Sequence, residues 1–133
     1  MSFRKEKKYR LTKSDFYILS SELDTLGMKM LFKKRQINSI YFDTKELQMF
    51  HDSEEGVLPR KKIRVRWYDF SNTYSKEIKI SSIEGRYKTS NTLDNIDELV
   101  DIHNKIFFDQ IYGYVYPLIQ ISYVRSYFEL NNI

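Results

Sequence analysis

The sequence contains no cysteine and only two histidines among its 133 residues. The absence of cysteine excludes a disulfide framework and a thiolate metal site. His51 and His103 lie far apart without the spacing of a metal-ligand pair, so we interpret both as structural. Glycine and proline are scarce as well, at four and two residues. No low-complexity tract or linker divides the chain, and we expect one domain over residues 1–133.

Long apolar runs are also missing. None approaches the roughly 18–20 residues that a helix needs to cross a bilayer, so no membrane span is expected. The N-terminal stretch is basic but has no apolar core behind it, which excludes a secretory signal, and we expect a cytoplasmic location. Hydrophobic residues make up 41% of the chain and charged residues 30%, a globular composition. Aromatic residues reach 16%, and they favour strands.

Charge is distributed unevenly around a formal net value of +4. Residues 1–13 hold six cations and one carboxylate, and residues 60–66 hold five cations. Residues 91–110 hold five carboxylates and one lysine. The cations lie in strand-like segments and the acids in a helix-like one. This separation indicates a basic surface or cavity that faces an anionic ligand.

Residues 62–67 show the clearest pattern, because a cation alternates with an apolar residue three times. Side chains alternate between the two faces of a strand, so one face carries Lys62, Arg64 and Arg66. The other face carries Ile63, Val65 and Trp67. Three cations on one strand face repel each other unless something anionic lies between them. A chain of phosphates is the obvious candidate.

The periodicity predicts an α+β protein with two helices and about six strands. Thr12 is positioned to cap the first helix and Gly27 to end it, and we expect this helix to lie on a sheet. The strands are expected over residues 3–11, 38–43, 62–68, 75–80, 86–88 and 118–128. The second strand has a short continuation at 46–51, which precedes a turn at 52–56. A hairpin turn is expected at 69–73. The helices are expected over 16–26 and 94–108, the second with a buried stripe of Ile96, Leu99, Val100, Ile102 or His103, Ile106 and Phe107.

Polar faces rich in cations recur in five segments, including Arg86 with Lys88 and Arg125 between Tyr123 and Tyr127. For any one strand, a charged face that meets water is an equally good interpretation. Five such strands, with two helices available to cover the apolar face, favour a sheet curved around a cationic interior. We therefore expect an antiparallel sheet, closed or curved like a β-barrel, with the helices packed on the outside.

The order of these segments resembles the VTC domain, the polyphosphate polymerase branch of the triphosphate tunnel metalloenzymes, which also include the CYTH proteins. The matching motifs cover most of the chain: they are Arg4-Lys-Glu6-Lys-Lys8-Tyr9, Ser39-Ile-Tyr-Phe-Asp43-Thr44, Lys62-Ile-Arg64-Val-Arg66-Trp-Tyr68, Lys76-Glu77-Ile-Lys79 and Tyr123-Val-Arg125. Each motif alone is weak, whereas the ordered series is fairly specific.

The resemblance implies a tunnel of antiparallel strands in which Arg and Lys hold a triphosphate or polyphosphate. The residues that it assigns to phosphate are Lys8, Arg64, Arg66, Lys79, Lys88 and Arg125, with Arg86 extending the path. It implies an ATP-binding phosphotransferase that moves the terminal phosphate of ATP onto a polyphosphate chain with Mn²⁺ or Mg²⁺. Glu6 and Glu77 are the candidate metal ligands, although a salt bridge that spaces the cations is the more common role for such carboxylates.

One departure from the family pattern concerns the C-terminal side. A complete VTC domain continues past the Tyr-x-Arg strand with another Arg and a late Glu-x-Lys, whereas this chain ends at Ile133. The expectation is an open tunnel, one completed by another chain in a homo-oligomer, or a piece or degenerate copy of the family fold. The first hypothesis is thus a metal-dependent polymerase. The alternatives are a catalytically incomplete polyanion-binding module and, with lower prior, a single-stranded nucleic-acid-binding protein; we expect no nucleic acid partner.

Overall fold

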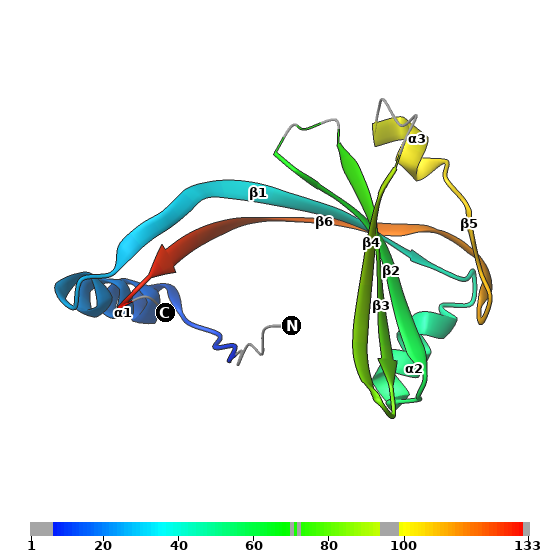
Figure 1. Cartoon of the computed structure of the whole chain (residues 1–133), viewed down its shortest axis with the longest axis horizontal. Coiled ribbons are helices and arrows are strands. Elements are labelled where there is room, and N and C mark those ends of the chain that lie inside the picture. Colours follow the sequence, from blue (N-terminus) through cyan, green and yellow to red (C-terminus); the bar gives the residue numbers. More distant parts are fainter. Residues whose placement is uncertain (1–6, 70, 72, 94–98, 132–133) are drawn as a thin grey trace. The chain divides into compact units, whose positions relative to one another are not determined.

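The computed structural model describes residues 7–69, 71, 73–93 and 99–131. The chain forms two compact units, one made of Met1–Lys34 with Ser126–Ile133 and the other of Arg35–Arg125. Figure 1 shows the elements of both units. We describe each unit by itself, and the candidate site lies in the larger one.

Nine elements follow one another along the described chain, and six of them are strands of one sheet. In order they are α1 (Lys13–Thr25), β1 (Lys29–Asp43), α2 (Gln48–Glu55), β2 (Arg60–Tyr68), β3 (Tyr74–Ser82), β4 (Gly85–Leu93), α3 (Leu99–His103), β5 (Phe107–Asp109) and β6 (Gly113–Glu129). The strand order in the sheet is β4-β3-β2-β1-β6-β5. Because β1 and β6 are long, each contributes residues to both units.

The smaller unit contains α1, and its predicted ends are confirmed. The hydroxyl of Thr12 accepts a hydrogen bond from the backbone N–H of Asp15 at 3.1 Å, which satisfies one free donor of the first turn. Gly27 adopts a positive φ of 96° just after the helix, where a residue without Cβ is favoured. No residue of α1 is buried.

The predicted N-terminal strand over residues 3–11 is wrong for its described part. Residues 7–12 lie outside regular structure, and residues 3–6 fall outside the described range. The reason is visible in the pattern, because Lys7 interrupts the side of the segment that Tyr9 and Leu11 make apolar. A segment without a continuous apolar face gains little from pairing on a sheet.

The larger unit is built on an antiparallel ladder that confirms the central strands and the hairpin turn at 69–73. β1 pairs with β2 from Ile37 opposite Tyr68 to Phe42 opposite Ile63. β2 pairs with β3, and β3 with β4, in the same antiparallel sense. The structure extends the expected strand at 86–88 to Gly85–Leu93 and the last strand to Gly113–Glu129.

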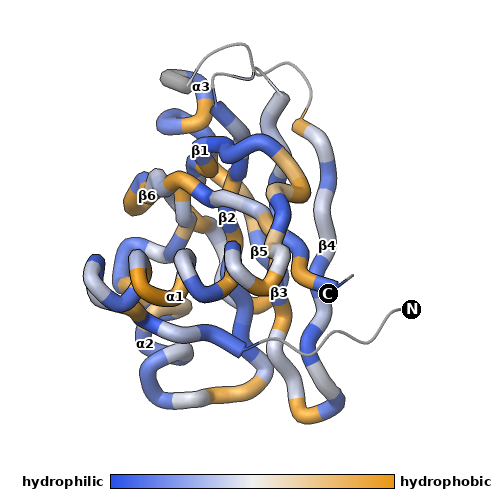
Figure 2. The backbone as a smooth tube through the Cα atoms, turned by 90° about the vertical axis from the view of Figure 1, so that its left-hand side faces the viewer, coloured by the Kyte–Doolittle hydropathy of each residue, from blue (hydrophilic) through white to orange (hydrophobic). Residues whose placement is uncertain are grey.

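The core of the larger unit lies on the apolar face of this ladder. Ile63 and Val65 are almost fully buried and Trp67 is buried beside them, as the alternation predicts. β1 contributes Ile40 and Phe42 to the same cluster. The cluster is completed by residues from other elements: Met49 of α2, Ile102 of α3, Tyr74, Phe107 and Val115. Figure 2 shows the hydrophobic and hydrophilic residues alternating along the strands.

The segment after β1 corrects the prediction of a strand at 46–51, because α2 occupies it. Asp43, at the end of β1, accepts hydrogen bonds from the N–H groups of Met49 and Phe50 at 2.9 and 3.0 Å. Thr44 accepts another from the N–H of Gln48 at 3.0 Å. Two side chains upstream therefore satisfy the donors that a helix leaves free in its first turn. Asp43 therefore ends β1 and caps α2.

The predicted helix over 94–108 is also corrected. Its described part forms α3 only as far as His103, and β5 begins at Phe107. Ile102 is fully buried as expected, whereas Ile106 is 53% exposed and Phe107 packs from a strand. Asp109 accepts hydrogen bonds from the N–H groups of Ile111 and Tyr112, which turns the chain from β5 into β6. Ile96 of the expected stripe lies outside the described residues, and nothing is described of the side chains of Leu99 and Val100.

The predicted fold class is confirmed. The fold is α+β, and the sheet is antiparallel in every pairing described. β4 and β5 are its two edges, so the described strands form an open sheet, which is an incomplete barrel. This arrangement leaves the polar face of β2, β3 and β4 on the side away from the core.

Candidate functional site

The register of the ladder places the predicted cations side by side. Lys62 of β2 lies opposite Lys79 of β3, and Lys79 lies opposite Lys88 of β4. These three lysines form one row across the sheet. The next two rows on the same face are Tyr41, Arg64, Glu77 and Ser90, followed by Ser39, Arg66, Ser75 and Thr92. We call Lys62, Arg64, Arg66, Lys79, Lys88 and Arg125 the basic face.

Like charges directly opposite one another on neighbouring strands destabilise a sheet. The electrostatics of Lys79 show this strain, since its pKa lies below the ordinary value of 10.5. Burial is the largest cause, and repulsion from Arg64, Lys88 and Arg66 lowers the pKa further, whereas Glu77 opposes the shift. A bound anion would relieve the same repulsion, so the row favours a ligand that carries several negative charges.

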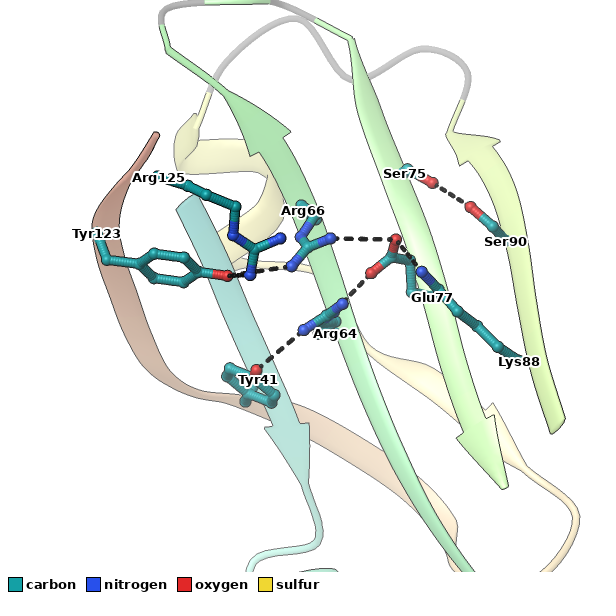
Figure 3. A network of polar contacts seen from close by, with 9 residues as sticks. All are labelled: Tyr41, Arg64, Arg66, Ser75, Glu77, Lys88, Ser90, Tyr123 and Arg125. Atoms are coloured by element: carbon teal, nitrogen blue, oxygen red, sulfur yellow. Dashed lines mark hydrogen bonds and ion pairs between the residues drawn. The ribbon is translucent and has the colours of Figure 1, made fainter. Parts of the chain in front are cut away.

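Glu77 lies at the centre of the basic face and is 7% exposed (Figure 3). One of its oxygens accepts a hydrogen bond from Nε of Arg64 at 2.6 Å. The other is 3.3 Å from Nζ of Lys88 and 3.9 Å from Nη1 of Arg66. Burial by itself would raise the pKa of Glu77, but the Arg64 hydrogen bond and the three positive charges outweigh it, and the pKa is lowered.

Arg64 is buried and held from two sides. Besides its contact with Glu77, its Nη1 donates to the hydroxyl of Tyr41 at 3.2 Å. Burial opposes its charge, but the hydrogen bonds to Tyr41 and Glu77 outweigh burial and raise the pKa of Arg64. The side chain of Arg64 is therefore a fixed, permanently charged group in the floor of the face.

Arg66 reaches across the sheet to β6. Its Nη2 donates to the hydroxyl of Tyr123 at 3.3 Å, and Arg125 donates to the same oxygen at 3.1 Å (Figure 3). β1 lies between β2 and β6 in the sheet, so this bond passes over a whole strand. Side chains two strands apart meet this way only where the sheet is curved. The basic face is therefore concave in the larger unit.

Two buried polar atoms on this face have no hydrogen-bond partner among the described residues. They are Nε of Arg66 and the hydroxyl oxygen of Ser39, which stand on directly opposed residues of β2 and β1. Buried polar atoms are nearly always paired, so two neighbouring exceptions mark a place where a ligand oxygen or a water completes the structure.

A pocket of about 430 Å³ opens beside the lysine row. Its polar wall contains Lys62, Arg64, Glu77 and Lys79. The remaining wall is mostly apolar and comes from β1, α2 and β6, including Phe42, Met49, Phe50, Leu118, Ile119 and Ile121. The basic face is thus partly hollowed, which lets a ligand approach the lysines from the side of α2.

The structure brings together most of the residues predicted from the sequence to bind phosphate. Arg64, Arg66, Lys79, Lys88 and Arg125 all lie on the concave side of the larger unit. Arg86 is exposed and shares the face of β4 with Lys88. Lys8 is an exposed residue of the smaller unit, and Glu6 lies outside the described residues.

Sequence reasoning missed the contributions of Tyr41 and Ser39. Both occur in the predicted strand over residues 38–43. Its β-forming residues indicate a strand but do not show which of its side chains share the face of Arg64. The alternation of that strand shows that Ser39 and Tyr41 share a face, but it does not show which residues of β2 share that face. The hydroxyl of Tyr123 accepts hydrogen bonds from two arginines, Arg66 and Arg125.

Glu77, one of the two predicted metal ligands, has a poor environment for a divalent ion. The part of the chain that the structure describes contains no group of three or more His, Cys, Asp or Glu side chains placed to hold a metal. Glu77 is already surrounded by Arg64, Arg66 and Lys88. A divalent ion there would add two positive charges to a place with an excess of them. The described residues therefore do not fit a metal at Glu77.

Fold and site together define a class of protein in which an antiparallel sheet curves around a face of Arg and Lys. The sequence matches the model of the VTC domain over residues 3–132, nearly the whole chain. The chain belongs to the VTC domain family, and this membership implies a polyphosphate-related function. No curated protein matches the sequence. Among the described residues, no helix is long and apolar enough to cross a membrane.

Proposed function

We propose that the basic face binds a chain of phosphates, either polyphosphate or triphosphate. The observation that carries the proposal is the convergence of the cations on one carboxylate, Glu77, on a concave surface. Family membership supports the same class of ligand. A linear polyanion matches this face because neighbouring phosphates present negative charge at several points along its rows.

Each kind of side chain has its own part in this proposal. Arg66 and Arg125 present planar forks that suit phosphate oxygens, whereas Lys62, Lys79 and Lys88 act as mobile point charges. Arg64 fixes the centre of the face. Lys8 remains a residue that the resemblance assigns to phosphate.

The binding test compares two lysines of the same strand. Lys79→Met removes a charge from the basic face, while Lys76→Met removes one from the opposite face, where the Lys76 amine lies 4.1 Å from the centre of the Phe107 ring. We expect Lys79→Met to weaken triphosphate binding about tenfold, because a hydrogen bond to a charged group contributes about 1.5 kcal/mol. Isothermal titration calorimetry with triphosphate measures both. Equal affinity of the two variants would contradict the proposal.

A second candidate function is phosphoryl transfer, and the family match favours it. In this proposal the terminal phosphoryl group of ATP passes to the end of a polyphosphate chain, leaving ADP and a chain longer by one phosphate. The basic face would contribute positioning and charge neutralisation, which account for most catalysis of this reaction type. Mn²⁺ or Mg²⁺ remains a proposed cofactor, with ligands other than Glu77.

Turnover separates this candidate from a non-catalytic binding module. The pure chain is incubated with ATP and Mn²⁺ or Mg²⁺, and ADP and polymer are measured by chromatography and gel electrophoresis. Polymer that grows with time, and fails to form in Arg66→Ala, supports phosphoryl transfer. Binding of polyphosphate without release of ADP supports a polyanion-binding module. An oligonucleotide that displaces polyphosphate at equal charge concentration would instead favour nucleic-acid binding.

A further inference from the structure

We infer that Glu77 is an internal counter-anion of the basic face, which partly occupies the place of a ligand phosphate and competes with it. The inference rests on the proposed binding of phosphate chains and assigns to Glu77 the role of setting their affinity. It departs from the sequence-based prediction that Glu77 holds a metal ion.

The two oxygens of Glu77 are held unequally. Oε2 has a short contact of 2.6 Å with Nε of Arg64. Oε1 has longer contacts, at 3.3 Å with Lys88 and 3.9 Å with Arg66. Short charge-assisted hydrogen bonds are considerably stronger than long ion pairs. One oxygen therefore fixes Arg64, and the other balances two neighbouring cations loosely.

The two loosely balanced cations have weaker contacts to Glu77 than Arg64 does, although the side chain of Arg66 is itself only 11% exposed. The side chain of Lys88 is 48% exposed, so its ammonium group moves in contact with solvent. Arg66 has an unpartnered Nε among the described residues, and its other contacts, to Tyr123 and Glu77, are at 3.3 and 3.9 Å. Exchanging these contacts for phosphate oxygens costs little. Arg64, with its short bond to Glu77 and its bond to Tyr41, stays in place.

Competition follows from the charge of Glu77. The carboxylate is buried and surrounded by cations, and a phosphate that approaches Arg66 and Lys88 also approaches this negative charge. Two like charges in a partly desolvated site repel each other more strongly than they do in water. Removing the charge while keeping the hydrogen bond to Arg64 should consequently strengthen phosphate binding.

Glu77→Gln removes the negative charge and keeps the hydrogen bond to Arg64. The amide oxygen still accepts from Arg64, while the NH₂ group faces Arg66 and Lys88. We expect its affinity for triphosphate to rise about three- to tenfold at about 50 mM salt, and the gain to shrink as salt screens the interaction. Asp101→Asn is the matched control. It makes the same change in net charge at an exposed residue of α3, which packs on the apolar face through Ile102.

The outcome is read from calorimetric titrations of triphosphate, with thermal unfolding to verify that each variant is folded. A gain in Glu77→Gln without a gain in Asp101→Asn supports the inference. Unchanged or weaker triphosphate binding in Glu77→Gln overturns the inference. Weaker triphosphate binding together with weaker Mn²⁺ binding would restore the role of Glu77 as a metal ligand.

If neither the unaltered chain nor Glu77→Gln binds triphosphate, the proposed function itself is contradicted. A second measurement then tests the counter-anion role of Glu77 separately. Sulfate is a simpler oxyanion and probes the same cations. Its stabilisation of the folded protein, measured as the rise in thermal-unfolding midpoint with sulfate concentration, should be larger in Glu77→Gln than in the unaltered chain. Equal rises would overturn the counter-anion role.

Discussion

Ser39 stands directly opposite Arg66 and is 1% exposed, yet its hydroxyl has no partner among the described residues. A buried hydroxyl normally contributes to stability through its hydrogen bonds and costs free energy when it is left unpaired. The ligand-free protein therefore gains little from this side chain. In the proposed complex with a phosphate chain, an anion oxygen would reach this hydroxyl beside Nε of Arg66.

We expect Ser39→Ala to leave the free energy of unfolding within about 0.5 kcal/mol of the unaltered chain, because no paired hydrogen bond is removed. Urea denaturation measures this difference. Ser122→Ala serves as the control, since its hydroxyl donates to Asn38 at 2.8 Å and its loss should cost about 1 kcal/mol. A loss from Ser39→Ala as large as that from Ser122→Ala would show that Ser39 has a structural partner.

Asp109 gives the protein a dependence on acid pH. Burial would raise the pKa of this carboxyl, but hydrogen bonds from Lys61 and from the backbone N–H groups of Tyr112 and Ile111 outweigh it and hold the pKa below 3.8. The folded state therefore binds the proton less readily than the unfolded chain does. The stabilisation of the folded state by the ionised Asp109 is fully present above the ordinary pKa of the carboxyl. It disappears as the pH falls through the pKa that Asp109 has in the folded state.

We expect the unaltered chain to be more stable than Asp109→Asn at pH 7, and the difference to shrink below about pH 4. Urea unfolding of both proteins across this range tests the direction. A difference that stays constant with pH would mean that the contact between Lys61 and Asp109, at 2.8 Å, does not depend on the charge of the carboxylate.

How far the site could be predicted depends on the kind of residue. Arg64, Arg66 and Lys79 followed from alternation, because a period of two fixes the face of each side chain. The role of Glu77 did not follow, since a sequence shows that a carboxylate is near cations and not how many of them contact it. Ser39 and Tyr41 needed the register of β1 against β2, which no local pattern reveals.

Among the elements, α2 shows where sequence patterns are insufficient. Residues 46–51 are few and contain no decisive period, and short segments of this kind are ambiguous between helix and strand. The helix is specified from outside its own sequence, by Asp43 and Thr44. The same holds for β5, whose three residues become a strand through pairing with Gly113–Val115. Longer elements such as α1 and β2 were predictable because their patterns extend over several turns or residues.

Replacement of the capping carboxylate should destabilise the end of β1 and α2 together. We expect Asp43→Ala to lower the free energy of unfolding by about 2 kcal/mol, because Asp43 is buried and two helix N–H groups lose their acceptor. Denaturation followed by circular dichroism measures the loss. Asp24→Ala, at an exposed position of α1, is the control and should change stability by less than about 0.5 kcal/mol.

At the scale of the whole molecule, the distribution of charge is more informative about ligand binding than the net charge of +4. Most cations of β2, β3 and β4 gather on one concave face, whereas Lys61 and Lys76 lie on the other, which the core occupies. Binding of a linear polyanion to such a face releases the counterions condensed on the polymer, so affinity should fall steeply as salt rises.

We expect the logarithm of the polyphosphate binding constant to decrease linearly with the logarithm of salt concentration. Lys79→Met should reduce the steepness of that line by about one, the share of a single phosphate contact. Fluorescence anisotropy with labelled polyphosphate provides the measurement. If Lys76→Met flattens the line as much as Lys79→Met does, the polyanion contacts both faces.

The bond from Arg66 to Tyr123 passes over β1 and thereby makes that strand the bottom of a trough with walls on either side. The side chains that stand up from β1 between the walls, Ser39 and Tyr41, are therefore what limits the depth available to a ligand. A small residue at one position and a large one at the next give the trough a deep and a shallow end. β1 therefore shapes the proposed phosphate site through the sizes of these two side chains.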